Sequence, residues 1–165
     1  TVKKSPFWEM GVDEFDKAMA VNVRGSWLCA KAAFPYMKQQ GKGKIINISS
    51  VLGLIAPSKG LQVPYTVSKH GVIALTKVNA VELAPLGIQV NAIAPGYFLT
   101  EMTAELSGSP IEQVIKRRTP DGRIGDTADL VGTCLYLASS ASDHVTGQCI
   151  AVDGGYLASD GLDRG

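Results

Sequence analysis

Cysteine and histidine are scarce in this chain of 165 residues, which contains three cysteines and two histidines. Cys29, Cys134 and Cys149 are widely spaced and form no Cys-x-x-Cys pair, and His70 and His144 lack the spacing of metal ligands. We therefore expect no metal site. We also expect the cysteines to be reduced and buried, as is usual in a cytoplasmic protein.

Excess charge and long apolar runs are also absent. The net charge is +1, and no apolar run approaches the roughly 18 residues of a membrane-spanning helix. These absences argue against nucleic-acid and membrane partners. The composition, 45% hydrophobic and 19% charged, predicts a soluble globular protein of about one domain. The basic positions are interpreted as solvated loops or helix ends, with a docking site for an acidic carrier as the alternative: Lys38, Lys42, Lys44 and residues 116–118.

Short β-branched runs mark the predicted strands, at residues 44–49, 88–94 and 149–152. Helical patterns alternate with these strands. The first helix is predicted from about Asp13 to Gln40, ending at Gly41, with a kink at Pro35. The β-α-β-α-β order predicts an α/β fold, in which a buried parallel sheet carries helices on both faces.

Two further helices are predicted between and after these strands. Pro85 and Gly87 close the second helix, whose packed face is predicted from an apolar series at helical spacing: Val67, Gly71, Ala74, Leu75 and Val78. The third helix is predicted over residues 126–139. The stretch 97–126 is expected to be irregular, with residues 97–122 forming a lid over a substrate.

Tyr65 and Lys69 are four residues apart in Tyr65-Thr66-Val67-Ser68-Lys69, so on a helix they share one face. A free tyrosine titrates near pH 10 and exchanges protons poorly at neutral pH. One cation about 4 Å away, at an effective dielectric of about 20, stabilises a phenolate by roughly 4 kcal/mol, enough for general acid–base work. A surface tyrosine and a solvated lysine are also common at this spacing, so the pair alone leaves both interpretations open.

The ends of the predicted strands indicate where a ligand would bind. Ser50 and Pro95 each follow a predicted strand, and open α/β sheets bind ligands at the C-terminal ends of their strands. Tyr65 opens the helix after the first of these strands, so three separate regions converge on one crevice. Ser49 is the competing serine, and an ordinary turn serine is the alternative interpretation.

Several motifs resemble those of the short-chain dehydrogenase/reductase family, in the order in which that family carries them. They are Asn22 in VNV, residues 43–53 (GKIINISSVLG), the pair Tyr65 and Lys69, residues 90–100 (VNAIAPGYFLT), residues 145–148 (VTGQ) and residues 152–155 (VDGG). The resemblance implies the C-terminal part of a Rossmann-type doubly wound parallel sheet, namely its strands 5 to 7 with their flanking helices. It also implies an NAD(P)-dependent oxidoreductase.

The resemblance assigns catalytic roles to residues that match the family's motifs. Tyr65 would pass a proton to or from the substrate oxygen while hydride moves to or from the nicotinamide. Lys69 would make the tyrosine a stronger acid and bind the nicotinamide ribose, and Ser50 would bind the substrate oxygen. Asn22 would hold a water that links the lysine to solvent, at a local kink in its helix.

The resemblance also implies a site for NAD or NADP. Pro95 and Gly96 would let the backbone approach the nicotinamide ring, because glycine has no Cβ to clash. The backbone at Phe98 and the hydroxyl of Thr100 would meet the nicotinamide carboxamide. Which of the two cofactors is used stays open, since that preference is set near the family's second strand.

The family's opening features are missing from the start of this sequence, which has no glycine-rich phosphate-binding turn and no Asn-Asn-Ala-Gly. Three strand–helix units of about 30 residues each would account for roughly 90 further residues. We therefore expect residues 1–165 to be the C-terminal two-thirds of a single NAD(P)-binding Rossmann domain. The alternative is a catalytically inactive binding or scaffold protein with this fold, or an inactive fragment.

Neighbouring types within the family are separable by sequence. A sugar-nucleotide epimerase needs a large C-terminal domain after Gly155, and a divergent enoyl reductase spaces its tyrosine and lysine further apart. A compact carbonyl/alcohol oxidoreductase remains, most similar to sugar or polyol dehydrogenases and 3-oxoacyl-carrier-protein reductases. A homodimer or homotetramer is expected because the first helix carries apolar residues beyond one stripe: Trp27, Phe34, Tyr36 and Met37.

Overall fold

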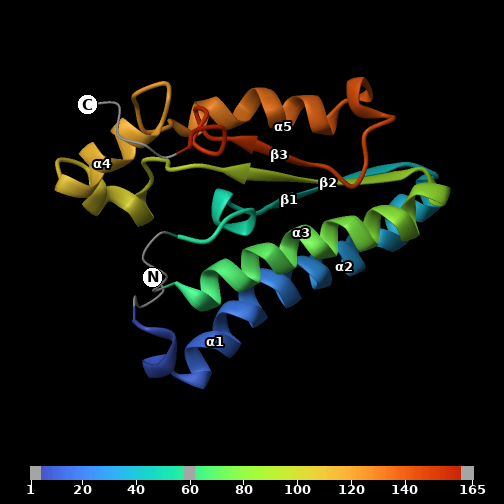
Figure 1. Cartoon of the computed structure of the whole chain (residues 1–165). Coiled ribbons are helices and arrows are strands. Elements are labelled where there is room, and N and C mark those ends of the chain that lie inside the picture. Colours follow the sequence, from blue (N-terminus) through green and yellow to red (C-terminus); the bar gives the residue numbers. More distant parts are fainter. Residues whose placement is uncertain (1–4, 58–61, 161–165) are drawn as a thin grey trace.

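A parallel sheet of three strands forms the centre of the protein (Figure 1). The computed structural model describes residues 5–57 and 62–160. The strands are β1 (Gly43–Ile48), β2 (Ile88–Pro95) and β3 (Cys149–Val152), in the order β1-β2-β3. The three strands lie within one residue of their predicted positions, and both pairings are parallel as predicted, with Gly43 opposite Ile88 and Ala92 opposite Cys149.

Helices cover both faces of this sheet, which confirms the predicted α/β layering. Figure 1 shows α2 and α3 on one face and α5 on the other. The α-helices are α1 (Val12–Met19), α2 (Gly25–Gln40), α3 (Val63–Leu83), α4 (Pro110–Arg118) and α5 (Val131–Ala138). Short 3-10 helices are η1 (Phe7–Glu9), η3 (Val51–Gly53), η4 (Ala84–Leu86), η5 (Glu101–Leu106), η6 (Thr127–Leu130) and η7 (Ser140–Ser142).

The first predicted helix is interrupted at Asn22. A π-helical segment, η2 (Ala20–Arg24), joins α1 to α2, and α2 continues through Pro35 to the left-handed Gly41. The interruption coincides with the local kink that was predicted at Asn22, and the kink at Pro35 stays a prediction. Such π-helical turns concentrate at functional sites, and this one is centred on a predicted site residue.

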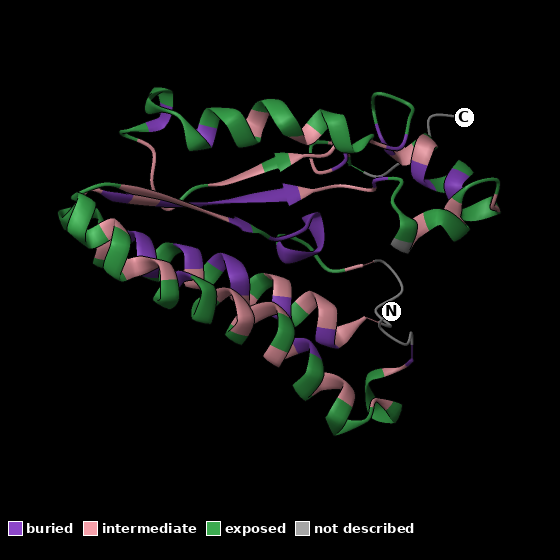
Figure 2. Ribbon diagram, turned by 180° about the vertical axis from the view of Figure 1, so that it is seen from behind, coloured by how far each residue is buried: buried purple, intermediate pink, exposed green. Residues whose placement is uncertain are grey.

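The central strand of the sheet is β2. Four of its residues are fully buried: Ile88, Val90, Ala92 and Ala94. Figure 2 shows buried residues along this strand and along the inner sides of the helices that cover it. β1 was predicted to be a buried strand and is not: most of it is half-buried, and Ile48 is exposed. The reason is that β1 pairs only with β2 among the described residues and so forms an edge.

The packed face of α3 is not the one predicted. Val67 and Val78, placed inside by the apolar series, are 41% and 55% exposed. The buried face instead carries Val72, Ile73 and Ala80 together with Ser68 and Thr76, and these two polar residues are fully buried. Hydrogen bonds make this possible, since the Asn47 Nδ2 donates to Thr76 Oγ1 over 2.9 Å; buried polar groups are tolerated when paired.

The stretch 97–126, expected to be irregular, contains the helix α4. Ser109 caps its first turn by accepting from the backbone N–H of Glu112, and Pro110 occupies the first helical position. Lys116 pairs with Glu112 one turn away at 2.7 Å. These local signals were present in the sequence and outweigh the polar, non-periodic composition that predicted a loop.

The cysteines are free, as expected, but they are not all buried. Cys29 and Cys134 are exposed and Cys149 is half-buried. Cys29 and Cys134 lie on α2 and α5, two helices whose outer faces carry apolar side chains such as Trp27 and Leu135. Among the described helices none is long and apolar enough to cross a membrane.

Candidate active site

Two chain segments are held together where β1 ends. The Ser49 hydroxyl donates to the carbonyl of Lys69 over 2.9 Å. A Cβ added at Gly53 would lie 2.5 Å from Ser49 Oγ and 2.8 Å from the Lys69 carbonyl oxygen, so no side chain fits there. The Lys69 Nζ donates to the Ile48 carbonyl over 3.0 Å. This contact brings the end of β1 against the first turns of α3.

Ser50 is buried at this contact and begins η3. Its Oγ accepts a hydrogen bond from the Leu52 N–H over 3.1 Å. This is the geometry of an ordinary turn serine, the alternative interpretation given from the sequence. The Oγ acts only as an acceptor in that bond, so its O–H remains a donor for another oxygen. Because the Ser49 hydroxyl already donates to the Lys69 carbonyl, the geometry favours Ser50 over Ser49.

Tyr65 and Lys69 lie on one face of α3, near its start. The Lys69 Nζ lies 5.6 Å from the centroid of the Tyr65 ring. Burial lowers the pKa of the Lys69 ammonium below its ordinary value, since a low-dielectric environment disfavours the charged form. The ammonium is thus held next to the tyrosine in a partly water-excluded place.

Asn22 joins this arrangement from the π-helical segment. Its Nδ2 donates to Ser68 Oγ over 2.9 Å, and Ser68 Oγ donates to the carbonyl of Tyr65 over 2.8 Å. The hydroxyl of Ser26 donates to the Asn22 carbonyl over 2.7 Å. Asn22 is therefore connected to the tyrosine's own turn, and its predicted water-binding role stays a prediction.

The predicted nicotinamide segment follows β2 at the same edge of the sheet. A Cβ on Gly96 would lie 2.9 Å from both Cα and Cβ of Asp153, so the turn that follows β3 requires this glycine. That requirement differs from the predicted one, in which the cofactor ring needed the space. The hydroxyl of Thr103 engages both Phe98 and Thr100: it donates to the Phe98 carbonyl over 2.6 Å and lies 3.0 Å from Thr100 Oγ1. Contacts of these residues with nicotinamide stay a prediction.

Sequence reasoning missed a group of aromatic residues beside Tyr65. Tyr156 is buried with Val51 and Leu52, and Tyr65 and Tyr97 pack against them. The rings of Tyr97 and Tyr156 meet edge to face with centroids 5.4 Å apart. Burial raises the pKa of Tyr97 to about 12, and the neighbouring Tyr156 adds to the rise. The position of Tyr97 directly after Pro95-Gly96 was the available signal.

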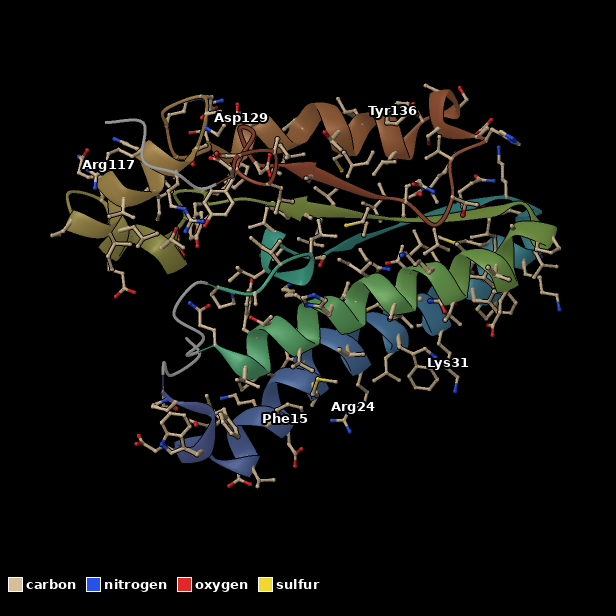
Figure 3. The ribbon with its side chains drawn as sticks, in the orientation of Figure 1. Phe15, Arg24, Lys31, Arg117, Asp129 and Tyr136 are labelled. Carbon is tan, nitrogen blue, oxygen red and sulfur yellow. The ribbon has the colours of Figure 1, made fainter. Side chains whose placement is uncertain are left out.

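A cavity of about 100 Å³ lies next to this group and shares Tyr97 with it. The basic side chain that lines this cavity is Arg123, which forms ion pairs with Asp129 at 2.6 Å and with Asp121 at 3.3 Å. Figure 3 shows Asp129 just before α5, on the opposite face of the sheet from α3. Ser50, Tyr65 and Lys69 do not line this cavity, and we regard its paired charges as structural.

Comparison with known protein sequences finds close relatives. A family model described as Enoyl-(Acyl carrier protein) reductase matches residues 1–157. The chain is 42% identical over 160 residues to the 2-dehydro-3-deoxy-D-gluconate 5-dehydrogenase of Escherichia coli, covering 95% of this chain and 62% of that protein. It is 42% identical over 146 residues to a 3-oxoacyl-(acyl-carrier-protein) reductase of Staphylococcus aureus, covering 88% and 58%.

Comparison with solved structures also finds a gluconate dehydrogenase. The gluconate 5-dehydrogenase of Burkholderia cenocepacia, crystallised in complex with NADP and tartrate, superposes with a TM-score of 0.90 at 38% identity. The match covers 95% of this chain and 61% of that one. The chain therefore spans about three fifths of the length of the relatives it matches.

The raised pKa of Tyr97 predicts a pH-dependent stability. An unfolded tyrosine ionises from its ordinary value of 10, whereas folded Tyr97 stays protonated to about 12. This contribution is fully present below pH 10 and is lost as the pH rises through 12. Ultraviolet titration of the phenolates should show a step near pH 12 that Tyr97→Phe removes. Tyr36→Phe, which removes an exposed phenol, should leave that step, and a Tyr97→Phe titration that retains it would disprove the assignment.

Proposed function

This chain belongs to the short-chain dehydrogenase/reductase family, and we propose that it acts in an NAD(P)-dependent oxidoreductase. The reaction transfers hydride between nicotinamide and a carbonyl or secondary alcohol. The observation that carries the proposal is the contact at the end of β1, which gathers Ser50, Tyr65 and Lys69 at one edge of the sheet. Parallel α/β sheets bind their ligands at that edge.

Each of these side chains has a distinct role in the proposal. Tyr65 is the general acid/base that exchanges a proton with the substrate oxygen. The Ser50 hydroxyl donates to the same oxygen and stabilises charge that develops on it. Lys69, whose ammonium lies beside the Tyr65 ring, stabilises negative charge on the phenol oxygen during proton transfer. Asn22 braces the turn that carries Tyr65, through Ser68.

The residues of this edge suit a nicotinamide cofactor. An ammonium has three donors, and Lys69 uses one of them on the Ile48 carbonyl, which leaves others for ribose hydroxyls. The end of β2 and the turn after it offer the backbone of Pro95, Gly96 and Phe98 and the hydroxyl of Thr100. NAD or NADP supplies the hydride acceptor or donor when bound. NADP is the cofactor in the solved Burkholderia relative.

The relatives support a small-molecule carbonyl or alcohol substrate, although their names span sugar acids and acyl thioesters. Both kinds of relative oxidise or reduce one carbon–oxygen centre. We further propose that residues 1–165 form one part of a single NAD(P)-binding domain, in line with the 62% of the Escherichia coli relative that they cover. The free thiols suit the reducing cytoplasm.

We also propose that a second copy of the chain covers the outer face of α2 and α3. Trp27 and Tyr36 are exposed there as expected, whereas Phe34 and Met37 pack into the core. On α3 this face continues through Val78 and Val81. Two such helix pairs, one from each copy, would bury these apolar side chains in a homodimer, from which a homotetramer could be built.

Replacing Tyr65 by Phe tests the catalytic role. Loss of the proton donor should lower kcat by about 10²- to 10⁴-fold, while binding of NADP, measured by fluorescence titration, changes little. Tyr136→Phe is the matched control, because Tyr136 lies on the outer side of α5 toward its far end (Figure 3). Wild-type turnover in the Tyr65 variant would exclude this residue as the acid/base. No turnover in the native protein, with NADP bound, would favour the binding or scaffold alternative.

Replacing Val81 by Glu tests the dimer. This residue is 78% exposed, and a buried unpaired carboxylate at a subunit contact is costly, so sedimentation should show a shift toward monomer at micromolar concentration. Val12→Glu is the matched control, since Val12 is 74% exposed but lies on α1. Equal sedimentation of all three proteins would count against an interface on this face.

A further inference from the structure

Arg118 is the last residue of α4 and lies over an aromatic ring. Its guanidinium carbon is 5.1 Å from the centroid of Tyr156. The Nε atom is buried and makes no hydrogen bond to any described residue. The sequence had placed this residue in a solvated basic run, so its half-buried position needs an explanation.

The ring beneath Arg118 belongs to the site. Tyr156 is buried with Val51 and Leu52, the two residues that follow Ser50, and Tyr65 packs against this group. Tyr97 meets Tyr156 edge to face, and the charge of Arg118 acts on the Tyr97 phenol. Arg118 and the proposed acid/base Tyr65 therefore contact the same group of aromatic side chains.

Other cations around α4 and the neighbouring loops are already neutralised. Lys116 pairs with Glu112 at 2.7 Å, and Arg123 pairs with Asp129 at 2.6 Å. Within the described part of the chain Arg118 has no carboxylate partner. The guanidinium lies over the Tyr156 ring and its Nε–H is buried, so the terminal N–H groups are the ones that a ligand would meet.

The backbone around Arg118 is fixed, so its guanidinium is presented from a rigid base. Thr119 is buried and its hydroxyl donates to the Ile115 carbonyl over 2.8 Å. The Asp121 N–H donates to the Gly154 carbonyl over 3.1 Å. These bonds tie the end of α4 to the turn that carries Tyr156, and hold the arginine and the ring in register.

We infer that Arg118 binds a carboxylate of the substrate and so selects hydroxy or keto acids over neutral polyols. The inference rests on the proposed function, because it places the carboxylate end of the substrate against α4 while the reacting carbon lies at Tyr65. An arginine edge suits a carboxylate because two parallel N–H···O bonds form. The gluconate dehydrogenases among the relatives are named for acids of this kind.

Calorimetric binding and kinetics of the native protein with NADP test this inference, using D-gluconate and the neutral D-glucitol as probes. Arg118→Met should weaken D-gluconate binding and raise its KM by about 10- to 100-fold, with D-glucitol affected less than about 2-fold. Arg118→Lys should recover part of the loss, since it restores charge without the paired N–H edge. Arg117→Met is the control, a neighbour on the same helix at the outer rim of the molecule (Figure 3), and should resemble wild type.

The outcomes separate this inference from the proposed function. Native protein that binds D-gluconate no more tightly than D-glucitol would overturn the inference, whatever its activity. Equal losses for both probes in Arg118→Met would also overturn it, because they would indicate a structural role. Selective loss of D-gluconate binding without turnover in the native protein would support the inference and refute the oxidoreductase proposal.

Discussion

Close packing between the end of β1 and the start of α3 is the constraint on which the site depends. Ser49 donates to the Lys69 carbonyl, Lys69 donates to the Ile48 carbonyl, and Gly53 leaves the space that both segments share. A side chain at Gly53 would force the segments apart. Ser50 and Tyr65 project from these two segments, so these contacts set the relative positions of the proposed hydrogen-bond donor and acid/base.

The two faces of α3 serve different purposes. Its inner face carries polar side chains, including Ser68 and Thr76, whose hydrogen bonds to Asn22 and Asn47 fix the helix on the π-helical segment and on β1. Directional bonds of this kind specify one register, which a purely apolar contact does less well. Its outer face is apolar through Val78 and Val81. The inner face also carries the buried Val72, Ile73 and Ala80, so hydrogen bonds set the register of a helix that apolar packing also holds in place.

Much of this arrangement was predictable from sequence. The strands, the left-handed Gly41 and the convergence of Ser50 with Tyr65 follow from β-branched runs, capping signals and parallel topology, which are local or topological rules. The buried face of α3 was not predictable, because its polar residues are buried by partners distant in sequence. The burial of Arg118 was missed for the same reason. The sequence shows a run of basic residues, but it does not show that the ring of the distant Tyr156 lies beneath the Arg118 guanidinium.

Isotope transfer tests the central claim most directly, that this edge of the sheet exchanges hydride with a carbon–oxygen centre. The native protein would be incubated with NADPH deuterated on the nicotinamide C4, together with 5-keto-D-gluconate or a 3-oxoacyl thioester. If this edge transfers hydride, mass spectrometry should find deuterium on the carbinol carbon of at least one alcohol product. NADPH binding without deuterium in either product would contradict the claim.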